Sequence, residues 1–69
     1  MNKTNILKEL SKLENFILLN RNNNIDTKEL LKYKDINNII EYITKKEELN
    51  VIKDGNVFIL NKVYIIENI

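Results

Sequence analysis

The side chains that carry out most enzyme chemistry are scarce in this sequence. It contains no histidine and no cysteine, so the commonest general base, metal ligand and thiol nucleophile are missing. Ser11 is the only serine, and no base is evident beside it. The carboxylates stand singly among lysines, without the paired spacing that metal or glycosidase chemistry uses. One glycine cannot build a glycine-rich phosphate loop. We expect no catalytic residues, no metal site, no cofactor and no enzyme activity.

Length and composition indicate one small domain spanning residues 1–69. Asparagine, lysine, isoleucine and leucine dominate, as a low-GC genome would produce. The formal net charge of +1 is by itself no electrostatic argument for binding nucleic acid. No apolar run is longer than residues 16–19, which is far shorter than the roughly 20 residues of a membrane span, and the N-terminus lacks a signal-peptide core. We expect a cytoplasmic protein with no membrane contact.

The first half of the chain is patterned as helices. Ile6, Leu10, Leu13 and Ile17 recur at helical spacing and predict a first helix that ends near Asn20. The polar residues 20–24 then break the pattern, because asparagine clusters favour turns.

Two shorter helices are predicted after this break. Asp26 followed by Glu29 resembles a capping box and begins the second helix, with Leu30 and Leu31 facing inward and Tyr33 at its end. Asp35 is the expected N-cap of the third helix. The third helix should bury Ile36, Ile39, Ile40 and Ile43 and expose Asn37, Asn38, Glu41 and Lys45.

The only glycine marks a β-hairpin. Asp54-Gly55 supplies the positive φ angles of a two-residue type I′ turn and predicts two strands within residues 49–60. Alternation puts one apolar set, Leu49, Val51, Phe58 and Leu60, on a single face. The opposite face carries Ile52, Val57 and Ile59, and it needs a cover from the C-terminal segment or from another subunit.

The C-terminal segment allows two predictions. Residues 62–69 are either a third strand that turns back at Asn61-Lys62 or a short helix capped by Asn61. In both cases the fold class is α+β.

This order of elements resembles a winged helix domain, in which a helix-turn-helix is followed by a β-hairpin wing. The resemblance covers about residues 25 to 62. Thr27-Lys28-Glu29-Leu30 and the hairpin "IKDGNVFIL" are most similar to the MerR-like, excisionase-type domains of mobile elements. Leu31 replaces the small alanine of that family, and Lys34-Asp35 replaces its turn glycine. The resemblance implies three helices followed by a hairpin wing, with Lys53 at the projecting tip.

The same resemblance implies double-stranded DNA as a partner. The third helix would enter the major groove, where asparagine can bind adenine and glutamate can accept a hydrogen bond from cytosine, while lysines at the edge would contact phosphates. The DNA-contact residues implied in this way are Asn37, Asn38, Glu41, Lys45, Lys46, Lys28, Lys34, Lys53 and Asn56. In the simpler alternative, Asn37 and Asn38 are solvent-facing residues of an asparagine-rich chain, and Lys53 only keeps a strand end soluble.

Two functions follow from the sequence. The first is a small homodimeric DNA-binding protein, namely a transcriptional regulator or an accessory factor of a phage, plasmid or other mobile element. The second is a protein-interaction winged helix module, a subunit adapter or an inhibitor of a host complex, without DNA binding. Near-neutral charge and Glu41 on the expected DNA-reading face favour the second, whereas the resemblance to winged helix domains favours the first, which is the function that we expect. The expected dimer or partner interface is Ile52, Val57, Ile59, Tyr64 and Ile66.

Overall fold

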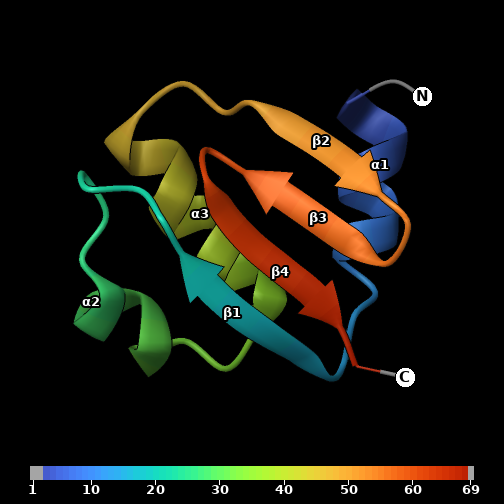
Figure 1. Cartoon of the computed structure of the whole chain (residues 1–69), viewed down its shortest axis with the longest axis horizontal. Helices are drawn as coiled ribbons and strands as arrows, with labels where there is room; N and C mark the ends of the chain where they lie inside the picture. The colour runs from blue at the N-terminus through green and yellow to red at the C-terminus, as the bar shows by residue number, and fades with distance from the viewer. Residues whose placement is uncertain (1–2, 69) are drawn as a thin grey trace.

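The computed structural model describes residues 3–68 as an antiparallel four-stranded sheet with helices packed on one face (Figure 1). The elements in chain order are α1 (Lys3–Leu10), β1 (Phe16–Asn20), α2 (Thr27–Lys32), α3 (Ile36–Lys46), β2 (Val51–Asp54), β3 (Val57–Leu60) and β4 (Val63–Glu67). The strand order across the sheet is β1-β4-β3-β2. Within residues 3–68, no helix is both long and apolar enough to cross a membrane.

One hydrophobic core lies between the sheet and the helices. Leu10 of α1, Leu30 of α2, and Ile39 and Ile43 of α3 are fully buried against the two central strands. Full burial of each such side chain contributes about 1.5–3 kcal/mol. The buried apolar residues are Ile6, Leu10, Ile25, Leu30, Ile36, Ile39, Ile43, Phe58, Leu60, Val63 and Ile65.

The winged helix layout, with three helices followed by a hairpin wing, is wrong, although the α+β class is compatible with the structure. The expected first helix ends at Leu10, and residues 16–20 form strand β1 instead. Strand β1 pairs along its length with β4, from Phe16 opposite Glu67 to Asn20 opposite Val63. The hairpin β2–β3 is therefore half of a continuous sheet and does not project as a wing.

Asp26 and Asp35 are the N-caps of the second and third helices as predicted, whereas Glu29 bonds to Lys32 at 2.7 Å and does not complete the expected capping box. The carboxylate of Asp26 accepts a hydrogen bond from the backbone N–H of Lys28 at 2.9 Å, and that of Asp35 accepts from Asn37 at 2.8 Å. Each bond satisfies one of the free N–H groups of a first helical turn. The inward placement of Leu31 is wrong, because its side chain is 61% exposed.

The hairpin turns one residue later than expected. Gly55 and Asn56 form the loop, and only Gly55 has a positive φ, of 62°. A two-residue loop in which only the first residue has a positive φ is a type II′ turn, whereas a type I′ turn requires a positive φ at both residues. Pairing is thereby shifted by two residues, so that Asp54 lies opposite Val57. An even shift leaves every side chain on its expected face, since the side-chain period of a strand is two.

The C-terminal segment is a strand, so the strand alternative is confirmed for Val63–Glu67; residue 69 lies outside the described residues. Asn61 and Lys62 both have positive φ, of 47° and 67°, in the two-residue loop between β3 and β4. Two positive φ angles identify a type I′ turn, whose twist matches that of the flanking strands. A turn at these two residues was expected as part of the strand alternative, but its type was not predicted.

Candidate functional site

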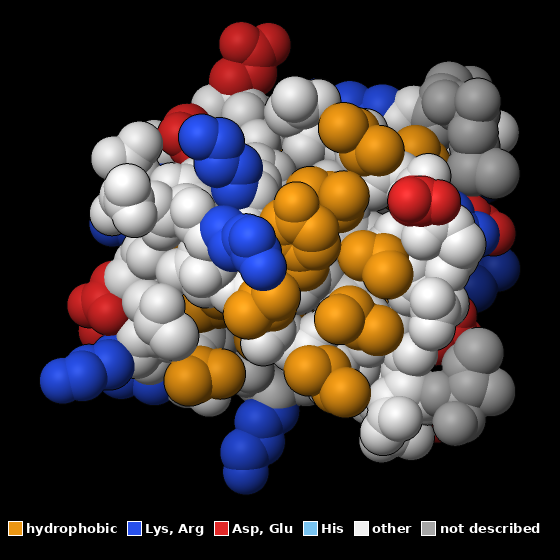
Figure 2. Space-filling view, in the orientation of Figure 1, with side chains coloured by type: hydrophobic (Ala, Val, Ile, Leu, Met, Phe, Trp, Pro, Cys, Tyr) orange, Lys and Arg blue, Asp and Glu red, His pale blue; other side chains and the backbone are white. Residues whose placement is uncertain are grey.

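The sheet face turned away from the helices carries a continuous apolar surface, which we call the open face. Its side chains meet across the strands, Ile17 opposite Ile66, Leu19 opposite Tyr64, and Ile59 opposite both Tyr64 and Ile52. Figure 2 shows this surface as one contiguous patch. The open face consists of Ile17, Leu19, Ile52, Val57, Ile59, Tyr64 and Ile66.

Exposure of the open face is high for aliphatic side chains. Ile17 is 54% exposed, Leu19 44% and Ile52 51%. The antiparallel sheets of soluble proteins usually present polar side chains on a face that no other layer covers. A contiguous apolar patch on a small domain commonly marks an interaction site.

Charged side chains stand at opposite ends of the open face. At the β3–β4 turn, the guanidinium of Arg21 lies 5.7 Å from the ring centroid of Tyr64, and Lys62 is exposed nearby. At the β2–β3 turn, Asp54 is exposed and shares the face of its cross-strand neighbour Val57. Within residues 3–68, neither Asp54 nor Lys62 takes part in an ion pair. The middle of the face is therefore apolar. Arg21 and Lys62 define its basic end, although Glu47 and Glu48 line the adjoining groove, and Asp54 defines its acidic end.

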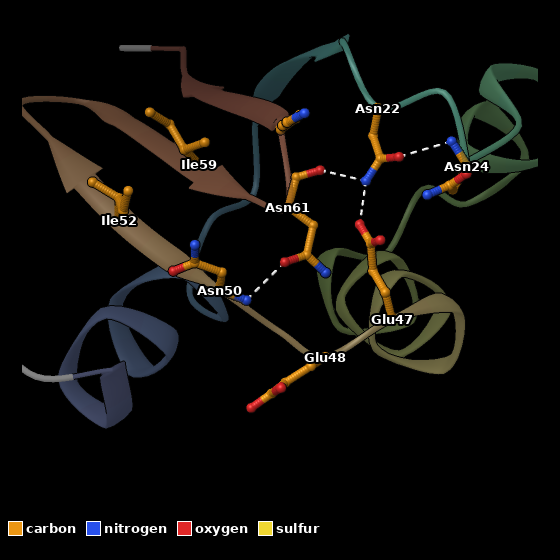
Figure 3. A pocket seen from close by; sticks show the side chains of 9 residues that line it. Asn22, Asn24, Glu47, Glu48, Asn50, Ile52, Ile59 and Asn61 are labelled. Atoms are coloured by element: carbon orange, nitrogen blue, oxygen red, sulfur yellow. Dashed lines mark hydrogen bonds between the residues drawn. The ribbon is translucent and has the colours of Figure 1, made fainter.

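A groove of about 480 Å³ continues the open face at its basic end. Ile52, Ile59 and Lys62 line it from the sheet, and Glu48 extends away from the two isoleucines (Figure 3). The remaining lining residues are Asn22, Asn24, Glu47, Asn50 and Asn61. The groove thus joins an apolar floor to a polar wall.

Asn22 holds the polar wall of the groove together. It is 6% exposed, and its amide nitrogen donates hydrogen bonds to the carboxylate of Glu47 and, at 2.7 Å, to the backbone carbonyl of Asn61 (Figure 3). Its amide oxygen accepts from the backbone N–H of Asn24 at 2.8 Å. One buried side chain therefore ties the β1–α2 loop to the end of α3 and to the β3–β4 turn. Sequence reasoning treated residues 20–24 only as a break.

The side chain of Asn61 connects the β3–β4 turn to the start of β2. Its side-chain oxygen accepts from the backbone N–H of Asn50 at 2.7 Å, which aligns the start of β2 with the β3–β4 turn. Its amide nitrogen is buried without a hydrogen-bond partner among residues 3–68. An unsatisfied buried donor costs about 1–3 kcal/mol.

The expected interface residues come together in the structure. Ile52, Val57, Ile59, Tyr64 and Ile66 all lie on the open face. Sequence reasoning missed Ile17 and Leu19, because it placed both in the first helix or at its end. Four consecutive apolar residues bounded by asparagines, as in residues 15–20, were the signal for a strand.

The DNA-contact residues expected on the third helix are exposed on α3 as predicted, away from the sheet. Two of their charges have partners: Lys45 forms an ion pair with Glu41 at 3.1 Å, and the ammonium of Lys46 lies 5.4 Å from the ring centroid of Tyr42. Asn37 and Asn38 stand in the first turn of the helix.

Lys53 does not lie at a projecting tip. It is on the helix-covered face of β2, opposite Phe58, and its ammonium contacts Glu9 of α1 at 3.1 Å. Its side chain is only 24% exposed. Asn56 in the adjoining turn is bound to the end of β4, since its carbonyl accepts from the N–H of Glu67 at 2.9 Å. The structure therefore separates Lys53 and Asn56 from the α3 residues.

The other two expected phosphate contacts lie on the helical side of the molecule. Lys28 is exposed on α2, and Lys34 is exposed in the loop that connects α2 to α3. Across residues 3–68, no three histidine, cysteine, aspartate or glutamate side chains gather to hold a metal ion. Comparison with protein-family models, curated proteins and solved structures found no match for this chain.

Proposed function

We propose that this protein is a protein-interaction module that binds its partner through the open face. The observation that carries the proposal is the uninterrupted apolar surface over all four strands, from Ile17 on β1 to Ile52 on β2. Covering such a surface removes apolar area from water at about 25 cal/mol per Å². The buried core lies on the helix-covered face, and no side chain of the open face belongs to it.

The charge distribution supports the same proposal. The net charge is only +1, and the lysines expected to contact DNA on α3 and β2 are engaged with Glu41, Tyr42 and Glu9. An interface with a protein partner has an apolar centre and a polar rim, and the open face has both.

A matched pair of lysine substitutions tests the proposal. Ile52→Lys places a charge in the open face, whereas Leu31→Lys places the same charge at an exposed leucine on α2. The immobilised chain is exposed to a cell extract supplemented with an untagged copy of itself. We expect the parent and Leu31→Lys to retain the same proteins and Ile52→Lys to lose them. Retention by a folded Ile52→Lys variant equal to that of the parent would contradict the proposal.

DNA binding by a regulator or accessory factor is a second candidate, supported by the exposed amides of Asn37 and Asn38 on α3. It predicts that affinity for mixed-sequence duplex DNA falls steeply with salt and that Lys45→Glu weakens it. A fluorescence-polarisation titration at two salt concentrations measures both. Absence of binding at low salt would exclude this candidate. The cytoplasmic location and the lack of enzyme activity stay predictions.

A further inference from the structure

We propose that the partner covering the open face is a second copy of this chain, stacked sheet on sheet about a two-fold axis perpendicular to the strands. This inference rests on the proposed interaction function and specifies its partner. It follows from the shape of the face, from its charges and from the position of the groove.

A flat sheet face is suited to another sheet. The open face is built largely from β-branched side chains on short strands of four or five residues. Two such faces interdigitate when sheets pack about 10 Å apart with their strands rotated by roughly 30°. A two-fold interface needs one surface that is complementary to itself.

The charges at the two ends select the orientation. A two-fold axis parallel to the strands would place the Arg21 and Lys62 end of one copy over the same end of the other. An axis perpendicular to the strands instead reverses the strand direction, so the basic end of each copy meets the acidic end of its partner. Opposite charges at the rim fix the register of an interface.

The groove gives this orientation a specific contact. Asp54 lies on β2 at the acidic end, and the groove lies at the basic end beside Ile52 and Ile59 of β2 and β3. The perpendicular axis keeps β2 over β2, so the β2–β3 turn of each copy reaches the groove of the other. Of the charged residues that line this groove, Glu47 is bound by Asn22 and Glu48 extends away from the two isoleucines (Figure 3). Asp54 therefore approaches Lys62, which takes part in no ion pair within residues 3–68.

The area involved predicts a weak dimer. Four strands spaced by about 4.8 Å form a face with a flat area of roughly 300 Å² per copy. The side chains that project from the face add to this area. With the rims, two copies bury on the order of 1,000 Å², the lower limit for a specific interface. We expect dissociation constants of ~1–100 μM.

Sedimentation equilibrium of the full chain over a range of concentrations tests the orientation through reversed charges. Asp54→Lys and Lys62→Asp should each raise the dimer dissociation constant ~10-fold, because both leave like charges facing one another. The double variant Asp54→Lys/Lys62→Asp should return to within about 3-fold of the parent. Aspartate is suitable at position 62 because it tolerates positive φ better than most residues. Circular dichroism checks that each variant is folded.

The alternative outcomes are distinct. A monomer at every concentration, combined with an Ile52→Lys-sensitive capture of some other protein, would overturn the second-copy inference and leave the proposed function standing. A dimer that persists in Ile52→Lys would overturn both. A dimer that Ile52→Lys abolishes but the charge reversals leave unchanged would overturn the orientation.

Discussion

The two faces of the sheet are built from the same kinds of residue but differ in how deeply these residues are buried. Leu60 and Ile65 on the helix-covered face are fully buried, while Ile17 and Ile52 on the open face are about half exposed. The difference lies only in which face the helices cover. The hydrophobicity of a residue therefore does not tell whether it stabilises the fold or an association with a partner. Substituting one residue on each face can distinguish the two roles.

The largest contrast is expected from truncating one side chain on each face. Leu60→Ala should lower the free energy of unfolding by about 3 kcal/mol, because it leaves a cavity in the core. Ile52→Thr should change it by less than about 0.5 kcal/mol, because the side chain stays β-branched and is exposed in the monomer. Urea denaturation at a protein concentration well below dimer formation measures both. Equal losses would contradict the distinction between the faces.

The next largest loss of stability is expected from a substitution in the polar wall of the groove. Asn22→Ala removes two donated hydrogen bonds and one accepted bond from a buried site, and we expect a loss of about 2 kcal/mol. Asn23→Ala, one residue away at an exposed position, is the control and should be near neutral. A loss no larger than that of the control would show that Asn22 does not hold the wall.

A smaller effect is expected at the β2–β3 turn, which carries Asp54 to the rim of the open face. Gly55→Ala has open space for its methyl group but must keep φ at 62°. The backbone strain should cost about 1 kcal/mol. Thermal unfolding measures the loss. Asn56→Ala, at a residue of ordinary φ, is the comparison, because it removes only the 3.3 Å hydrogen bond from the Asn56 side chain to the carbonyl of Glu67. A Gly55→Ala variant as stable as the parent would argue against the type II′ turn.

The smallest effect is expected where a charge lies on the covered face. Lys53→Met keeps an apolar stem over Phe58 and loses the contact with Glu9. Partly exposed ion pairs contribute little, so the change in stability should be less than about 1 kcal/mol. Urea denaturation of Lys53→Met beside Lys12→Met, at an exposed position, measures the difference. A loss of several kcal/mol would show that the pair is structural.

Local patterns in the sequence predicted the parts of the fold that local forces determine. Asp26 and Asp35 cap helices through bonds two residues away, and such bonds can be anticipated from spacing alone. The hairpin faces were also predicted correctly, because a two-residue error in pairing returns each side chain to its own face. Ile52, Val57 and Ile59 of the open face were found for that reason.

The parts that failed depend on distant contacts. Strand β1 pairs with residues at the other end of the chain, and the helical spacing of Ile6, Leu10, Leu13 and Ile17 contains no information about that partner. Lys53 was placed at a tip although strict alternation with Val51 puts it on the covered face. The Asn22 contacts bring together three loops, and no local pattern encodes their meeting.

The central claim is that a second copy covers the open face, and methyl NMR with a soluble nitroxide tests it most directly. At low protein concentration the nitroxide should relax the methyl groups of Ile17, Ile52 and Leu31 alike, because all three are exposed in one chain. At high concentration we predict protection of Ile17 and Ile52 and continued relaxation of Leu31. Isoleucines of the open face that stay equally accessible at every concentration would contradict the claim.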